Sequence, residues 1–99
     1  MNTSTSRNPS SDKSGISFPV LQSWNPMTQV ATIAAQVNGK RVLCRISKSA
    51  LEKKFGVPED SPMNAVTENR HEIEDAARKL IENEAYEEDG SIVIEYKNL

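Results

Sequence analysis

Residues 38 and 39 read Asn-Gly, and they separate two runs in which apolar and polar residues alternate. The first run extends from Gln29 to Val37, and the second from Lys40 to Ile46. An Asn-Gly loop favours a type I′ turn, because these two residues tolerate the positive φ angles that both central positions require. The pattern predicts a β-hairpin, and its apolar face requires further elements to cover it.

The two-residue turn also predicts the register of the hairpin, because it pairs Val37 with Lys40. In that register three cross-strand pairs on one face are entirely apolar: Ala35 with Val42, Ile33 with Cys44, and Ala31 with Ile46. The other face pairs Gln36 with Arg41, Ala34 with Leu43, and Thr32 with Arg45. Turn chemistry and alternation therefore agree on which face is buried.

A short helix is predicted after the hairpin. Ser47 and Ser49 are both candidate N-caps, and Ser49 is preferred because residues 49–52 read Ser-Ala-Leu-Glu, which fits the capping box. We expect this helix to end at Gly56, because glycine favours the left-handed conformation that follows a helix. Pro58 then prevents its continuation.

A second, long helix is predicted from Ser61 and Pro62, since serine is a favoured N-cap and proline a favoured first helical residue. Apolar residues then recur at a spacing of three and four. We expect the helix to end near Tyr86, which corresponds to a length of about 35 Å at 1.5 Å per residue.

Short segments at both ends of the folded part complete the prediction. Residues 16–18 alternate and favour a short strand, residues 24–27 read Trp-Asn-Pro-Met and favour a turn, and residues 92–96 alternate as a final strand after the turn at Asp89-Gly90. The predicted fold is α+β. An antiparallel sheet of the β-hairpin plus the C-terminal strand carries a short and a long helix on one face.

Composition divides the chain into a tail and one domain. Eleven of residues 1–15 are Ser, Thr, Asn, Pro or Gly, and the segment has too little apolar surface to offset the entropy of ordering it. We therefore predict a disordered N-terminal tail over residues 1–15 and a single α+β domain over residues 16–99.

Four short motifs follow one another along the predicted domain. Residues 44–47 read Cys-Arg-Ile-Ser, residues 50–51 Ala-Leu, residues 69–74 Asn-Arg-His-Glu-Ile-Glu, and residues 89–92 Asp-Gly-Ser-Ile. This series resembles a family of short bacterial proteins known as domain of unknown function 1488, over about residues 16–96. Val66 departs from the pattern, which favours a larger aromatic residue there, and the N-terminal tail is additional. The resemblance implies a small cytoplasmic bacterial protein with an α+β fold, and it supplies no activity and no catalytic residue.

Several function classes are disfavoured by counts alone. The chain has one cysteine and one histidine, so it has no thiolate zinc site, no disulfide framework and no histidine-rich metal site. No apolar run approaches the ~18 residues of a membrane span. We expect no cofactor, no metal and no membrane, and a lone cysteine without a secretory signal predicts a cytoplasmic location.

Three single residues are candidates for chemistry. Cys44 lies on the inward face of the predicted hairpin, which favours a buried thiol over a nucleophile. His71 adjoins Glu74 and Asp75 on the long helix, which favours a solvated surface over a metal site or a pH-sensitive pair. Arg70 interrupts the apolar stripe of that helix. It is either a structural bridge to a carboxylate or backbone carbonyls, or an anchor for an anionic ligand.

Charge is distributed unevenly along the chain. Residues 1–58 carry eight basic and two acidic residues, whereas residues 62–89 carry nine acidic and three basic residues. A basic hairpin and short helix therefore oppose an acidic long helix. This asymmetry is typical of proteins that bind an acidic protein partner, associate head to tail or bind nucleic acid. A role in solubility alone is equally compatible with it.

We expect a noncatalytic protein-interaction or accessory module that binds a protein partner or forms a homodimer. The expected contact surface is the outer face of the hairpin and its continuation, with Arg41, Leu43, Arg45 and Lys48. The alternative is weak nucleic-acid binding through Lys40, Arg41, Arg45, Lys48, Lys53 and Lys54, which is not favoured because no aromatic residue lies between these basic residues. A third hypothesis is a small enzyme that uses Cys44 or a carboxylate, although no catalytic constellation is present in the sequence.

Overall fold

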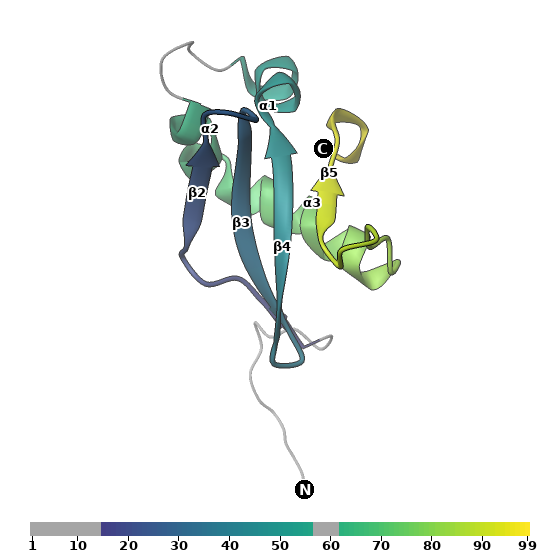
Figure 1. The fold of residues 1–99 in the computed structure, drawn as a ribbon. Helices are drawn as coiled ribbons and strands as arrows, with labels where there is room; N and C mark the ends of the chain where they lie inside the picture. The colour runs from purple at the N-terminus through teal and green to yellow at the C-terminus, as the bar shows by residue number, and fades with distance from the viewer. Residues whose placement is uncertain (1–14, 57–61) are drawn as a thin grey trace, which may run out of the picture.

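In the computed structural model, which describes residues 15–56 and 62–99, one five-stranded sheet carries helices on one face (Figure 1). The strands are β1 (Ile16–Ser17), β2 (Gln22–Asn25), β3 (Val30–Val37), β4 (Lys40–Ser47) and β5 (Ile92–Ile94). The helices are α1 (Lys48–Phe55), α2 (Pro62–Glu68) and α3 (Arg70–Glu82), and a short 3₁₀ helix follows at Tyr96–Asn98. The predicted α+β class is confirmed. The predicted tail, residues 1–15, lies outside the described residues apart from Gly15.

The predicted hairpin and its register are confirmed in β3 and β4. Val37 pairs with Lys40, and the three apolar pairs of the inner face lie opposite each other as expected. Asn38 and Gly39 have φ angles of 53° and 86°, which are the signs that a type I′ turn requires.

The sheet contains more than the predicted three strands. β1 and β2 both pair antiparallel with β3, and β2 was not predicted from the sequence. The predicted turn at residues 24–27 begins two residues later than expected, because Trp24 and Asn25 still pair with β3. The Asn25 side chain then accepts hydrogen bonds from the N–H groups of Met27 and Thr28, which closes the turn.

The C-terminal strand differs from the prediction in direction and length. β5 pairs with β4 in parallel, with Cys44 opposite Ile92, so the sheet is only mostly antiparallel. The helices between β4 and β5 carry the chain back along the sheet, which is the connection that a parallel neighbour requires. The strand ends at Ile94, and Tyr96 begins the 3₁₀ helix instead of extending the strand.

α1 begins two residues earlier than the preferred cap predicted. Ser47, not Ser49, is the N-cap, and its Oγ accepts a hydrogen bond of 3.1 Å from the N–H of Ala50. Ser47 is still extended, with φ of −78° and ψ of 157°, because it ends β4. The predicted C-terminal glycine is confirmed, since Gly56 is left-handed with φ of 66°.

The predicted single long helix is wrong, because it is interrupted at Asn69 and ends at Glu82. Asn69 has φ of −116° and ψ of 25°, and its side-chain amide donates a hydrogen bond to the carbonyl of Ala65 at 2.9 Å. Asparagine side chains compete for backbone partners in this way, and they disfavour helix interiors for that reason. The predicted cap Ser61 lies outside the described residues.

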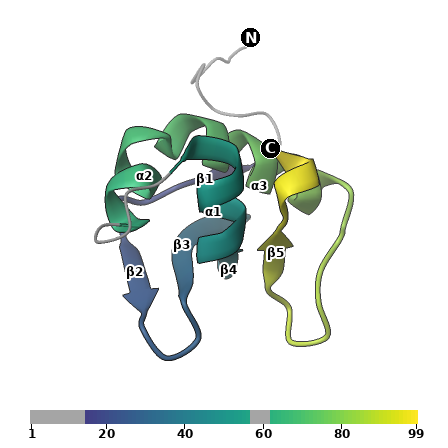
Figure 2. The same ribbon diagram turned by 90° about the horizontal axis from the view of Figure 1, so that it is seen from above.

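The core lies between the sheet and the helices. Figure 2 shows α2 and α3 on one side of the strands, and Figure 1 shows α1 just past the end of β4. The largest fully buried side chains include Ile33 and Ile46 from the sheet, Leu51 from α1 and Ile73 from α3. Within the described ranges no helix is long and apolar enough to cross a membrane.

The turn that sets the hairpin register can be tested at Gly39. A Cβ at this position meets nothing within 4 Å, so Gly39→Ala changes only the conformational preference of the backbone. We expect the free energy of unfolding to fall by about 1 kcal/mol, because an alanine at positive φ is strained. Urea unfolding measures this loss, with the exposed neighbour substitution Lys40→Ala as control. Equal midpoints for the two variants would contradict the type I′ assignment.

Candidate functional site

The face of the sheet opposite the helices is left uncovered by any described helix (Figure 2). We call it the open face. The strand register brings to it Arg41, Leu43 and Arg45 of β4, Thr32 and Ala34 of β3, Ser23 of β2 and Val93 of β5. Leu43, which is 41% exposed, lies between the two arginines along β4. Val93, which is 37% exposed, lies opposite Arg45 on the edge strand β5.

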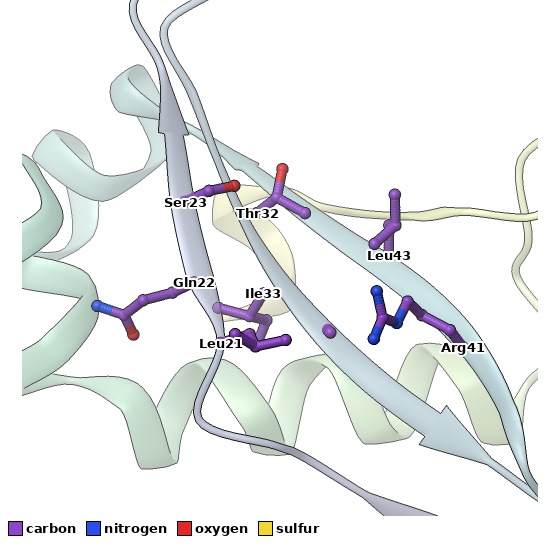
Figure 3. A pocket seen from close by; sticks show the side chains of 8 residues that line it. Leu21, Gln22, Ser23, Thr32, Ile33, Arg41 and Leu43 are labelled. Carbon is purple, nitrogen blue, oxygen red and sulfur yellow. The ribbon is translucent and has the colours of Figure 1, made fainter.

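Two shallow hollows flank Leu43. The first, of about 250 Å³, lies over β2, β3 and β4 and is shown in Figure 3. It is lined by Leu21, Gln22, Ser23, Thr32, Ile33, Ala34, Arg41 and Leu43. The second, of about 360 Å³, lies between β4 and the loop before β5, and is lined by Arg41, Leu43, Arg45, Asp89, Gly90 and Ser91. Arg41 and Leu43 therefore line both hollows.

The loop before β5 is attached to the open face through Asp89. One carboxylate oxygen accepts a hydrogen bond of 3.0 Å from Arg45, and the other accepts bonds from the N–H and hydroxyl of Ser91 at 2.9 and 2.6 Å. The bonds from Ser91, and then the one from Arg45, lower the pKa of Asp89 to about 2. The carboxylate is therefore ionised at neutral pH and fixes one terminal nitrogen of Arg45.

The sequence-predicted contact residues separate into two groups. Arg41, Leu43 and Arg45 lie together on the open face, as the alternation of β4 predicts. Lys48 does not join them, because the chain leaves the sheet at Ser47 and begins α1. The Lys48 ammonium lies 3.8 Å from Glu52, one helical turn away, and the residue lines neither hollow.

Arg41 and Arg45 differ in their contacts. Arg45 pairs with Asp89, whereas no carboxylate of residues 15–56 or 62–99 lies within ion-pair distance of Arg41. Figure 3 shows the Arg41 guanidinium turned toward β3, beside the hollow that it lines. Arg41 thus presents a cation on the open face next to an apolar side chain.

Arg70 is surrounded by acceptors of this chain. Its Nε donates to Glu74 at 2.8 Å, one Nη donates to Gln22 Oε1 at 2.7 Å and to the Val20 carbonyl at 3.2 Å, and the other donates to the Pro19 carbonyl at 2.6 Å. These contacts hold the segment before β2 against α3. They agree with the structural bridge that the sequence suggests, and they account for the arginine without an anionic ligand.

Cys44 and His71 lie far from any reactive arrangement. The Cys44 side chain is fully buried, and this burial raises the pKa of its thiol to about 12, although the charge of Arg70 opposes the shift. The His71 side chain is 92% exposed, and its Nε2 lies 4.0 Å from Asp75. Over the two described ranges, no group of three or more His, Cys, Asp or Glu side chains is placed to hold a metal ion.

Lys53 and Lys54 of α1, which belong to the nucleic-acid hypothesis, contact groups away from the open face. The Lys54 ammonium lies 3.7 Å from Glu72, and that of Lys53 lies 4.8 Å from the centre of the Tyr96 ring. The cations of α1 thus engage groups of the C-terminal half of the chain and do not extend the basic surface of β4.

Some residues of the open face were not predicted as site residues. Asp89, Ser91 and Val93 reach it through the parallel pairing of β5, Ser23 reaches it through β2, and Leu21 reaches it from the segment directly before β2. The Asp-Gly-Ser sequence at residues 89–91 signals a turn closed by its own aspartate. No local signal connects that turn with Arg45.

Comparisons with known proteins agree on one family. The family described as "Protein of unknown function (DUF1488)" matches residues 16–94. The crystal structure of a protein of unknown function from the DUF1488 family of Shewanella loihica PV-4 is similar, with 26% sequence identity and a TM-score of 0.77. The similarity covers 86% of this chain and 97% of that chain. No curated protein matches the sequence.

Arg70 can be tested through stability. We expect Arg70→Ala to lower the free energy of unfolding by about 2 kcal/mol, because it removes charge-assisted hydrogen bonds and leaves the carboxylate of Glu74 without its partner. Arg70→Lys should restore only part of this loss, since one ammonium cannot reach all the acceptors. Urea unfolding measures both, with the exposed substitution Lys79→Ala as control. An unchanged stability in Arg70→Ala would favour the ligand-anchor hypothesis instead.

Cys44 can be tested with a thiol reagent. The thiolate is the reactive form, and a pKa of about 12 leaves it scarcely populated at about pH 8. We therefore expect a maleimide to leave the native protein unlabelled over a time in which it labels the urea-unfolded protein completely. Rapid labelling of the native protein would contradict the buried placement and reopen the enzyme hypothesis.

Proposed function

The chain belongs to the DUF1488 family, and on that premise we propose that it is a noncatalytic interaction module that binds a protein partner through the open face. The observation that carries the proposal is the composition of that face. Antiparallel sheets commonly present one face to water, and such faces are normally polar. Here Leu43 and Val93 supply exposed apolar surface beside Arg41 and Arg45, which is typical of a contact surface.

The noncatalytic part of the proposal is supported by the state of the reactive side chains. The one thiol is buried with a raised pKa, and the one imidazole is exposed on α3. Among the described residues, the lining of the first hollow contains no acidic residue, and that of the second contains Asp89, whose oxygens are already bonded to Arg45 and Ser91. A general acid or base needs an available proton site near a bound substrate, and these groups do not offer one.

We place the module in the bacterial cytoplasm. The family member with a crystal structure comes from Shewanella loihica, and a single cysteine suits a reducing compartment. The proposal includes two kinds of partner, another protein and a second copy of this chain. The test below distinguishes both from nucleic acid.

The proposal is tested with two substitutions at the centre of the open face. Arg41→Glu reverses the available charge, and Leu43→Thr removes apolar surface while keeping a residue that favours strands. We expect a protein captured by the tagged wild type from a nuclease-treated lysate to be depleted at least about fivefold by either substitution, because central contacts dominate an interface. Sedimentation at several concentrations reports in parallel whether the partner is a second copy.

Lys79→Glu is the matched control, since it makes the same charge change at an exposed position of α3. It should retain the captured protein. Capture that is equal in all variants would contradict the proposal. Capture that disappears with nuclease treatment and falls steeply with salt would instead support nucleic-acid binding, because counterion release dominates such complexes.

A further inference from the structure

We infer that the open face receives an extended segment of a partner protein whose alternate residues read acidic, apolar, acidic. The inference rests on the proposed function and specifies the chemistry of the partner. Three residues of β4 carry it: Arg41, Leu43 and Arg45, which lie in line on one face of the sheet.

The spacing of these residues matches that of an extended peptide. Side chains of one strand face repeat every second residue, with a rise of about 3.3 Å per residue, so Arg41 and Arg45 are about 13 Å apart along β4. A peptide in the extended conformation has the same period. Its first and fifth residues therefore meet the two arginines when its third residue lies on Leu43.

Charge complementarity selects acidic residues for the two outer positions. Residues 15–51 contain no Asp or Glu, so the strands β1 to β4 place no carboxylate on the open face. Arg41 has no carboxylate in ion-pair distance within the described part of the chain, and Asp89 contacts only one terminal nitrogen of Arg45. Both guanidiniums thus keep N–H groups that are not paired with a carboxylate of the described residues, and these can donate to carboxylates of the segment.

The shape of the face selects an apolar residue for the central position. Leu43 separates the two hollows, which are bordered by Ala34 on one side and Gly90 on the other. These small residues leave room beside Leu43 for an aliphatic side chain of the segment. Its burial against Leu43 adds the hydrophobic contribution that two exposed ion pairs alone do not supply.

Two other occupants fit less well. A nucleic-acid strand offers phosphates to the arginines, but neither hollow is lined by an aromatic side chain on which a base would stack. A symmetric contact between two copies through the open face would set the basic row of β4 against the same row of the partner, which is repulsive.

The test is a selection of random peptides displayed on phage, with the full-length wild-type protein as bait and Arg41→Glu as counter-bait. We expect the enriched peptides to share two acidic residues four positions apart with an aliphatic residue midway. A synthetic peptide of the consensus should bind about tenfold more weakly to Arg41→Glu, because an attractive pair becomes a repulsive one. Lys79→Glu should bind it as the wild type does.

Peptide variants separate this inference from the proposed function. Exchange of both acidic residues for lysine, or of the central residue for serine, should each weaken binding to the wild type. Enriched peptides that depend on Leu43 but carry no acidic pair would overturn the inference and leave the open face as an interaction site. Enriched peptides that bind Arg41→Glu and Leu43→Thr as well as they bind the wild type would overturn the inference. The proposed function has its own test, because it would be overturned if both variants captured the lysate partner as well as the wild type does.

Discussion

The register of β3 against β4 is the constraint on which the rest of the structure depends. The Asn38-Gly39 turn pairs Val37 with Lys40, and the twofold period of strands then assigns every residue of the hairpin to one face. A shift of β4 by one residue against β3 would expose Cys44 and Ile46 and would bury Arg41 and Arg45. The helices cover the first set because it is apolar, and the second set is left to form the open face. Core and candidate site are therefore two consequences of one turn.

The parts that the sequence predicted are those set by neighbours in the chain. The hairpin, its register, the glycine that ends α1 and the α+β class follow from turn residues and from periodicity within single segments. The shared face of Arg41, Leu43 and Arg45 follows from the same period. β2, the parallel direction of β5 and the contact of Arg45 with Asp89 depend on where distant segments meet, so no local pattern indicates them. Lys48 lies apart from these three residues for a local reason, because Ser47 both ends the strand and caps the helix.

The Asn-Arg sequence at residues 69 and 70 shows how two adjacent polar residues change a helix. The apolar spacing alone predicts one long helix, whereas the structure has two, α2 and α3. Asn69 donates hydrogen bonds to the Ala65 carbonyl from both its backbone and its side-chain nitrogen, and the helix is interrupted there. Arg70, the next residue, directs its guanidinium to the segment before β2. That segment supplies Leu21 and Gln22 to the first hollow. A residue that interrupts the apolar stripe thus supports the open face from the opposite layer.

The two arginines of β4 show why a basic surface and a binding surface are different things. Arg45 is engaged by a carboxylate whose lowered pKa keeps it charged, so this arginine fixes the loop before β5 and the wall of the second hollow. Arg41, four residues earlier on the same face, lacks such a partner among the described residues and borders both hollows. An arginine that is already paired with a carboxylate of its own chain attracts a partner's carboxylate less than an arginine without such a pair. Net charge along the sequence does not distinguish the two residues, whereas their contacts predict that Arg41 contributes more to binding of a partner than Arg45 does.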